Sequence, residues 1–335
     1  MYSRFPTARV LTLAACVAVA LPVSVHTARA QFKAPEMSKE VRQHEDEMQK
    51  LGESFDSAWD LYQHFKEKAD GGTIAPKYSK LPDWSGLWER RDGPFFLDPE
   101  QTDFNGMPPV ELTPKYEQEL KERLKRYAAG NDYDPISVCG VPAGFPRFMV
   151  EPFMREFVPT PKQTWLINEA GNEVRRIYTD GRGHIPPEAA YPLYEGDSIG
   201  FWDGQKLVVH TSQIKGTVLQ RIQPRDSDKA ETVEIWEKID DNTIKVDLWI
   251  YDQEAFKKPW FSQQFYRKIP NDDGLLRIHF WACAENQNNV ITKTGEGGST
   301  FTDFTFTNED DKQKKKQNDG QNGQDEQSMP WNEDK

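Results

Sequence analysis

Short segments in which apolar and polar residues alternate occupy most of the second half of the chain, and this alternation restricts the fold more than any other feature. The segment 243–251 shows it best, because apolar aliphatic residues occupy every second position from Ile244 to Ile250. A period of two predicts a β-strand with one face in a core. Turn residues separate such segments, and Asp203-Gly204 is a strong signal for a tight hairpin.

No helical pattern of crossover length separates these segments, so we expect antiparallel rather than parallel pairing. Strands this regular and consecutive predict a mainly β fold, an antiparallel closed barrel with peripheral N-terminal helices, and a β-sandwich is the alternative. The expected strands cover residues 84–89, 164–168, 173–178, 198–202, 205–211, 232–239, 243–251, 261–268, 275–283 and 300–306.

A short motif favours the barrel over the sandwich. Gly86-Leu87-Trp88 is a Gly-x-Trp sequence immediately before the β region. It resembles the entry into the first strand of lipocalin-like barrels, where the Trp closes one end. A barrel of about eight strands has room inside for side chains or for one small ligand.

The first thirty residues are typical of a secretory signal peptide. Two arginines precede the apolar run 10–25, and Ala28-Arg29-Ala30 follows it as a small-x-small cleavage signal. The run is too short for a stable membrane span. Leu13-Ala14-Ala15-Cys16 offers an alternative, a lipidated Cys16, which its position inside the apolar run disfavours. We therefore expect a periplasmic or secreted protein that starts at Gln31.

Helical and polar patterns divide the remaining chain. Residues 31–80 are expected to be a helical segment, with one helix at 37–70 whose aromatic stripe packs on the main domain. The barrel domain spans 81–308 and includes a helix at 114–129, which Thr113 can cap and Gly130 can end. Residues 309–335 are almost entirely polar, which predicts a disordered tail.

The chain is acidic. Its formal net charge is −12, and removal of residues 1–30, which hold three Arg and no acid, brings the charge to −15. Such a surface repels nucleic-acid phosphate and anionic lipid, so we expect no nucleic-acid partner and no stable membrane insertion.

Two cysteines, Cys139 and Cys283, remain after cleavage. A lone pair of cysteines in an oxidising compartment predicts a disulfide, and two buried free thiols are the alternative. The sequence contains no zinc-type cysteine spacing and no glycine-rich phosphate loop, and we expect neither a metal nor a cofactor.

Several motifs resemble a family of secreted bacterial β-rich proteins that has no assigned activity. They are Cys139-Gly-Val-Pro-Ala-Gly-Phe-Pro-Arg147, Arg175-Arg-Ile-Tyr-Thr-Asp-Gly-Arg-Gly-His184 and Tyr194-Glu-Gly-Asp-Ser-Ile-Gly-Phe-Trp202, continuing to Thr211. The resemblance covers about half of the chain and implies a secreted β-rich fold. The family often has Asp where this chain has His210, which weakens a general catalytic role for that position.

The segment Asp180-Gly181-Arg182-Gly183-His184 carries the densest set of reactive side chains. His184 has the reference pKa for proton transfer near neutrality, and Asp180 can support it. Arg182 can pair with Asp180 or hold a ligand carboxylate. His210 lies in a strand that is apolar on both sides, so we expect it in the interior as a hydrogen-bonded core histidine. A catalytic or ligand-contacting histidine that points into the barrel is the alternative. A plain turn is the alternative reading of 180–184.

Further residues are candidates for ligand contacts. Arg147 can bind an anion or neutralise a nearby acid, and Glu195 acquires a raised pKa if it lies in a dry cavity. Tyr178 and Trp202 lie in expected strands and can line a pocket. His184, His210, Asp180 and Glu195 have no metal-ligand spacing, so a metal site is disfavoured.

Three functions are compatible with these observations. The first is periplasmic binding of a small apolar or amphipathic molecule in the barrel, oriented by Arg147, Arg182 and His184. The second is a cofactor-free lyase, isomerase or hydratase with a His base and an Arg that stabilises the anion. The third is a cell-envelope interaction protein.

Overall fold

In the computed structural model, the described residues are 39–90, 110–129, 142–151, 153–219, 224–281, 289–291 and 297–299. The expected signal peptide, the polar tail, the strand at 300–306 and the pair Cys139 and Cys283 lie outside these ranges.

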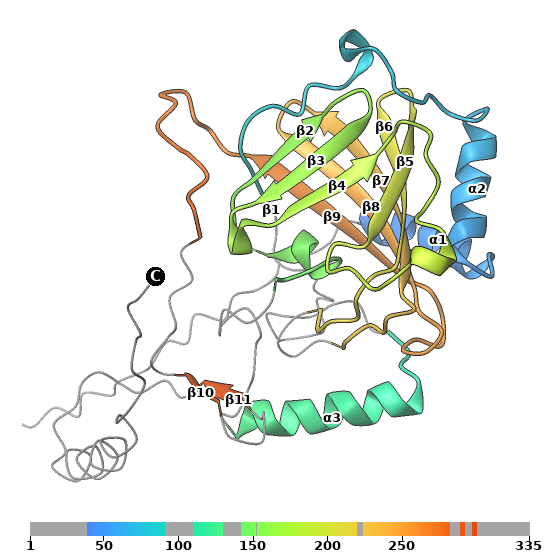
Figure 1. Cartoon of the computed structure of the whole chain (residues 1–335), viewed down its shortest axis with the longest axis vertical. Helices are drawn as coiled ribbons and strands as arrows, with labels where there is room; N and C mark the ends of the chain where they lie inside the picture. Colours follow the sequence, from blue (N-terminus) through green and yellow to red (C-terminus); the bar gives the residue numbers. More distant parts are fainter. Residues whose placement is uncertain are drawn as a thin grey trace, which may run out of the picture. The chain divides into compact units, whose positions relative to one another are not determined.

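Nine strands close into a barrel, β1 to β9 in chain order, with β9 pairing back to β1 (Figure 1). The predicted barrel is therefore confirmed, and a sandwich is not formed. The strands are β1 (Trp88–Arg90), β2 (Arg155–Pro159), β3 (Gln163–Asn168), β4 (Val174–Tyr178), β5 (Asp197–Asp203), β6 (Lys206–Ser212), β7 (Glu231–Asp240), β8 (Thr243–Tyr251) and β9 (Trp260–Lys268). Two short strands, β10 (Asn289–Ile291) and β11 (Gly297–Ser299), form a separate pair.

The prediction of antiparallel pairing is wrong at one place. Strands β4 and β5 run parallel, with Ile177 opposite Ser198 and Tyr178 opposite Ile199. Parallel neighbours need a long connection rather than a hairpin, and residues 179–196 supply it. This crossover contains no helix longer than the single 3-10 turn Pro187–Ala189. A helical sequence pattern therefore does not reveal the parallel connection.

Two strand predictions differ from the structure. Strand β2 was not expected, because Pro159 and Pro161 follow closely and weaken the strand signal. Residues 275–281 form no strand, although the pattern predicted one at 275–283. The remaining boundaries within the barrel agree to within a few residues.

Aromatic rings fill much of the barrel interior. Trp236 stacks on Tyr266 with centroids 5.8 Å apart, and Trp84 lies 5.7 Å from the ring of Trp202. Trp88 of the Gly-x-Trp motif is fully buried and donates from its indole nitrogen to the Trp84 carbonyl over 2.9 Å. Side chains thus occupy the space that a ligand would need.

The segment 142–151 closes one end of the barrel, next to strand β4 (Figure 1). It contains the 3-10 turn η3 (Arg147–Val150), all of whose residues are buried. Phe145, Phe148 and Met149 belong to the same core as the interior tryptophans. The hydroxyl of Tyr266 on β9 donates to the Met149 carbonyl over 2.8 Å. We call this segment the plug.

Helices cover the outer face of strands β6 to β9. The single helix expected at 37–70 is in fact two, α1 (Lys39–Glu53) and α2 (Ala58–Lys68). The chain breaks between them because Ser57 caps α2 by accepting a hydrogen bond from the Asp60 amide. Helix α2 packs on β6, β7 and β8, and α1 packs on β9.

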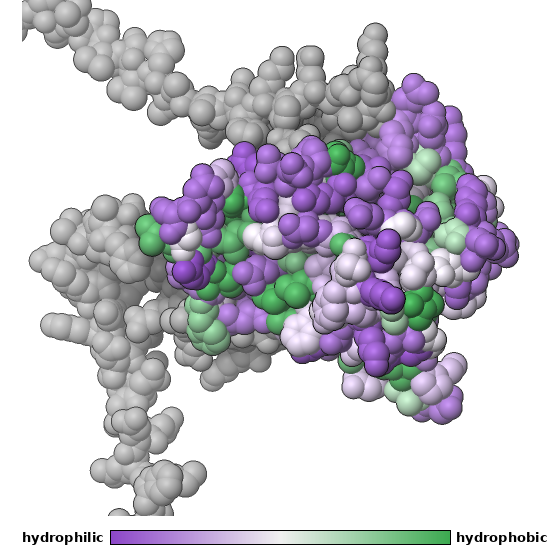
Figure 2. Space-filling view, turned by 90° about the horizontal axis from the view of Figure 1, so that it is seen from above, coloured by the Kyte–Doolittle hydropathy of each residue, from purple (hydrophilic) through white to green (hydrophobic). Residues whose placement is uncertain are grey.

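Helix α3 (Pro114–Ala128) confirms the helix expected at 114–129. It is tied to the segment before β9 by Thr113, whose amide donates to the Ala255 carbonyl. Within the described ranges, none of the helices combines the length and the apolar character that a membrane crossing requires. The face seen from the top of Figure 1 is mostly hydrophilic, with hydrophobic residues in separate patches (Figure 2).

We expect Gly200→Ala to destabilise the barrel. A Cβ at Gly200 would lie 2.6 Å from the Val208 carbonyl oxygen, which belongs to backbone and cannot move aside. Overpacking of this kind typically costs about 1–3 kcal/mol, measurable as a lower free energy of unfolding in urea. Gly183→Ala is the matched control, because a Cβ there meets no atom within 4 Å. Equal stability of the two variants would contradict the packing described here.

Candidate functional site

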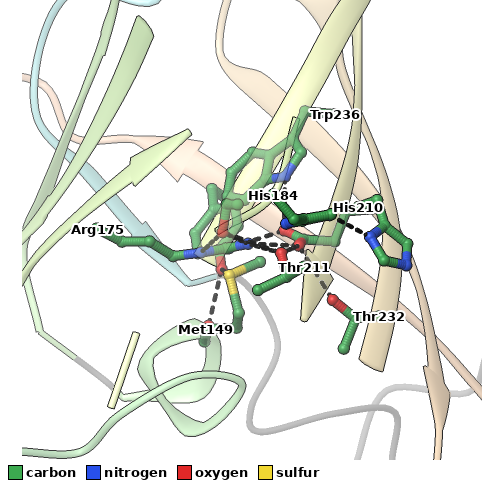
Figure 3. Close-up of polar contacts among 10 residues, drawn as sticks. Met149, Arg175, His184, His210, Thr211, Thr232 and Trp236 are labelled. Carbon is green, nitrogen blue, oxygen red and sulfur yellow. Dashed lines mark hydrogen bonds and ion pairs between the residues drawn. The ribbon is translucent and has the colours of Figure 1, made fainter. Parts of the chain in front are cut away.

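A buried ion pair crosses the barrel interior. Arg175 on β4 donates to both carboxylate oxygens of Glu234 on β7, at 2.9 and 2.6 Å, and both side chains are fully buried (Figure 3). Thr211 accepts a further hydrogen bond from Arg175 at 2.8 Å, and Trp236 donates to Glu234 at 2.9 Å. The ring of Phe145 from the plug lies 3.6 Å from the guanidinium.

This interior network is closed on itself. The donors of Arg175 are taken up by Glu234, Thr211 and Ser198, and the plug covers the guanidinium. A buried charge is tolerated only when it is paired and hydrogen-bonded in this way. The network therefore holds β4, β5, β6 and β7 together and buries Arg175 away from a substrate.

His210 lies on the opposite face of strand β6. It is buried and hydrogen-bonded, as expected of a core histidine, but the alternative that it points into the barrel is wrong. Thr211 and Val209 point inward, so the period of two turns His210 outward. There it contacts α2, with the Tyr62 ring 5.6 Å and the Trp59 ring 5.2 Å from its own. The strand looked apolar on both faces because helix α2 covers its outer face.

The structure brings the two histidines together. The Nε2 atom of His184 lies 2.7 Å from Nδ1 of His210 (Figure 3). The Nδ1 atom of His184 lies 2.8 Å from Asp197 Oδ2, which also accepts the Ile185 amide at 2.9 Å. Ser212 lies 3.2 Å from the same ring nitrogen. The crossover 179–196 carries His184 to this place beside β5 and β6.

A second carboxylate stands at the far end of this row. Glu231 Oε2 lies 3.5 Å from His210 Nε2, too long for a good hydrogen bond but close enough for an ion pair. The groups form a chain in the order Asp197, His184, His210 and Glu231, which we call the relay. Glu231 was not among the expected site residues, although the alternation in 231–236 places it on the same face as Val233.

When both imidazole rings are neutral, one nitrogen of the relay, Nε2 of His210, carries no proton. If His184 donates from Nδ1 to Asp197, its Nε2 accepts the proton on Nδ1 of His210. The Nε2 of His210 then carries a lone pair that faces the Glu231 carboxylate. A proton added at this gap would create an imidazolium between two carboxylates.

Electrostatic effects keep Nε2 of His210 unprotonated near neutral pH. Burial lowers the pKa of His210, His184 lowers it further, and Glu231 opposes both effects. Burial acts to raise the pKa of Asp197, but the hydrogen bonds from His184 and Ile185 prevail and lower it. The relay therefore holds an ionised Asp197 at one end and, next to Glu231 at the other end, an unprotonated His210 that can accept a proton.

Among the described residues, Glu231 is the most exposed member of the relay. The side chain of Glu231 is 40% exposed, against 17% for His184 and 2% for His210. Glu231 forms part of a groove of about 240 Å³ beside the first turn of α2. The groove is lined by Asp56, Ser57, Ala58, Lys229, Glu231, Tyr251, Gln253 and Glu254.

Three of the expected site residues form a separate surface cluster. Arg182 donates to both oxygens of Asp180, with contacts of 2.9, 3.2 and 2.7 Å, and stacks over the Tyr178 ring at 3.9 Å. The pKa of Asp180 is lowered by its hydrogen bond to Arg182. The hydrogen bonds of the Asp180 carboxylate go to Arg182 and not to either histidine, and the segment 180–184 is thus a turn whose last residue alone joins the relay.

The other expected ligand residues lie inside the fold. Arg147 is buried and bonds Glu151 at 2.6 Å. Trp202 belongs to the barrel core. Both carboxylate oxygens of Glu195 are buried, and burial raises its pKa well above the usual value. Among the described residues, no three His, Cys, Asp or Glu side chains are grouped closely enough to hold a metal ion.

An open hollow of about 490 Å³ lies between the segment before β1 and strand β2. Trp84 and Phe157 are buried beneath it, and Leu81, Pro82 and Val158 form its sides. It exists because β1 and β2 pair only at Trp88 and Arg155, so the two chains diverge beyond that point.

Fold and site together define a closed β-barrel, compatible with a lipocalin-like arrangement, that carries a row of titratable side chains in contact on its outer face beneath a helix. Neither the known protein-family models nor the curated proteins contain a match to this chain. The resemblance to secreted bacterial proteins therefore remains a prediction from the motifs alone.

We expect Arg175→Met to be among the most destabilising substitutions in the barrel. It leaves Glu234 buried and ionised without its cation, which typically costs about 3–5 kcal/mol. The double variant Arg175→Met/Glu234→Gln removes the uncompensated charge and is expected to recover a large part of that loss. Urea unfolding of both variants measures the coupling. If the double variant recovers none of the free energy of unfolding that Arg175→Met loses, the two side chains do not depend on each other.

Proposed function

We propose that this protein is a cofactor-free enzyme of the lyase, isomerase or hydratase class that moves a proton on a small molecule. The observation that carries the proposal is the 2.7 Å contact between His184 and His210 within a row that ends in Asp197 and Glu231. Paired titratable groups in hydrogen-bond contact are what general acid–base catalysis needs, and they favour catalysis over simple binding.

Glu231 is the catalytic residue in this proposal. Both nitrogens of His184 are engaged by Asp197 and His210, and His210 is 2% exposed, so neither ring can reach a substrate. Glu231 stands in the groove and can take a proton from a bound molecule. His210 then draws that proton toward the relay, where Asp197 stabilises the resulting imidazolium.

The groove indicates the kind of molecule. Its walls carry three carboxylates, of Asp56, Glu231 and Glu254, and one ammonium, of Lys229, together with the Tyr251 ring. A volume of about 240 Å³ suits a small polar molecule rather than the apolar one expected from the sequence. In this arrangement Lys229, rather than Arg182, is the cation that can stabilise a developing anion.

The common step of these reaction classes is proton exchange at carbon, so the test follows deuterium incorporation. Small ketones, aldehydes and β-hydroxy acids are incubated with the protein in D₂O, and exchange is followed by proton NMR. We expect Glu231→Gln and His210→Asn to slow exchange by about 10²–10⁴-fold. His279→Gln is the matched control, because His279 is exposed and bonds only Glu169 at 3.2 Å.

The pH dependence gives a second readout of the same experiment. Because the pKa of His210 is lowered, the rate is expected to fall only below the usual histidine value of about 6.5. Deuterium exchange at the wild-type rate in Glu231→Gln would contradict the assignment of Glu231 as the catalytic residue. If no compound exchanges deuterium faster with the protein than without it, the catalytic proposal is wrong.

A second candidate function, binding of a small apolar molecule, is favoured by the 490 Å³ hollow above Trp84 and Phe157. An apolar probe such as 1-aminoanthracene is expected to bind there and to change tryptophan fluorescence. Val158→Asp places a charge on the wall and should weaken binding at least about tenfold, whereas Ile239→Asp, on an exposed residue elsewhere, should not. Equal affinity of the two variants would exclude this hollow.

A further inference from the structure

Two glutamates meet where the plug enters the barrel. Glu173 immediately precedes β4, and Glu195 lies two residues before β5, so the parallel pairing of these strands brings them together. Glu173 Oε1 accepts the Ala143 amide of the plug. Glu173 Oε2 and both oxygens of Glu195 are buried without a hydrogen-bond donor among the described residues.

Three buried acceptors without a donor are costly, because each forfeits its bonds to water. Two ionised carboxylates in contact repel each other in addition. A single proton removes both penalties, since a carboxyl group donates to a neighbouring carboxylate. We propose that Glu173 and Glu195 share one proton, and that this proton fastens the plug, residues 142–151, in the end of the barrel.

Charged groups around the pair act in both directions. Arg175 faces Glu195 from β4 and favours its ionised form, whereas Glu151 of the plug disfavours ionisation of Glu173. Arg155 of β2 also interacts with Glu173. Burial is the largest effect and raises the pKa of both glutamates, that of Glu195 well above its usual value.

Hydrogen bonds from backbone amides of the plug reach Glu173 and the residue before Glu195. Glu173 accepts amides from residues 143 and 144. The residue before Glu195, Tyr194, accepts the Phe145 amide at 2.7 Å. Gly144 has φ +71°, and a Cβ there would lie 3.0 Å from the Tyr194 carbonyl oxygen, so the two chains touch at this point. Phe145, held in this way, covers Arg175.

Loss of the shared proton places two adjacent negative charges under the plug. A raised carboxyl pKa stabilises the folded state fully below the ordinary glutamate pKa of about 4.3. That contribution is lost progressively as the pH rises through the raised value. The plug is therefore secured below the raised pKa of the pair and loosens above it, independently of the relay on the outer face.

Hydrogen–deuterium exchange of the plug amides tests the proposal on the full-length protein. In the wild type, protection of residues 143–145 is expected to fall at least about tenfold more between pH 6 and pH 10 than intrinsic exchange predicts. Glu195→Gln keeps a donor for Glu173 and cannot ionise, so its protection should stay constant. Glu188→Gln, on an exposed residue of the same crossover, should behave as the wild type.

A second measurement uses only the wild-type protein, so it does not depend on whether a variant folds. In protein labelled with ¹³C at the glutamate Cδ, one resonance is expected to remain in the carboxyl form above the ordinary glutamate pKa of about 4.3 and to titrate together with the loss of plug protection. Absence of such a resonance, or a Glu195→Gln plug that loosens like the wild type, would overturn the proposal. Neither result depends on catalysis by Glu231.

Discussion

The parallel pairing of β4 and β5 is the constraint on which the rest of the structure depends. It replaces a hairpin with the crossover 179–196, and this segment carries His184 across the barrel to the outer face of β6. The same pairing sets Glu173 beside Glu195 and Arg175 beside Ser198. One topological feature thus supplies a member of the relay, the fastening of the plug and one end of the interior network.

Strand β6 separates two polar systems that behave differently. Thr211 on its inner face belongs to a saturated network around Arg175 and Glu234, in which every charge is paired and no group is free to react. His210 on its outer face belongs to a chain with one unfilled proton position and one end open to solvent. Saturation gives stability, and the unfilled position gives the capacity to accept a proton.

The aromatic content has a structural role more than a ligand-binding one. Tryptophans at 84, 88, 202 and 236 lie in the barrel core, and Trp59 covers the histidine pair from α2. The interior rings occupy the volume that a lipocalin-like ligand would need. For this reason the chemistry proposed here lies outside the barrel, in the groove between helix α2 and strands β7 and β8.

Opposite pKa shifts at Glu195 and Asp197 show how position within one short segment decides the role of an acid. Asp197 receives donors from His184 and Ile185, which lower its pKa despite burial. Glu195 meets burial and another carboxylate, which raise it. The two residues are only two positions apart and lie before and within the same strand, yet the pKa of one carboxyl is lowered and that of the other is raised.

The sequence by itself determined the strand periods, most strand boundaries, a closed barrel as the first of two architectures, and His184 and His210 as candidate site residues, because these follow from local alternation and side-chain chemistry. It could not reveal that α2 covers β6, so it left open whether His210 points into the barrel or away from it. It also missed Glu231, Glu173 and the Arg175–Glu234 pair. These depend on which strands lie side by side and on the crossover between β4 and β5, and only the tertiary structure decides such contacts between distant residues.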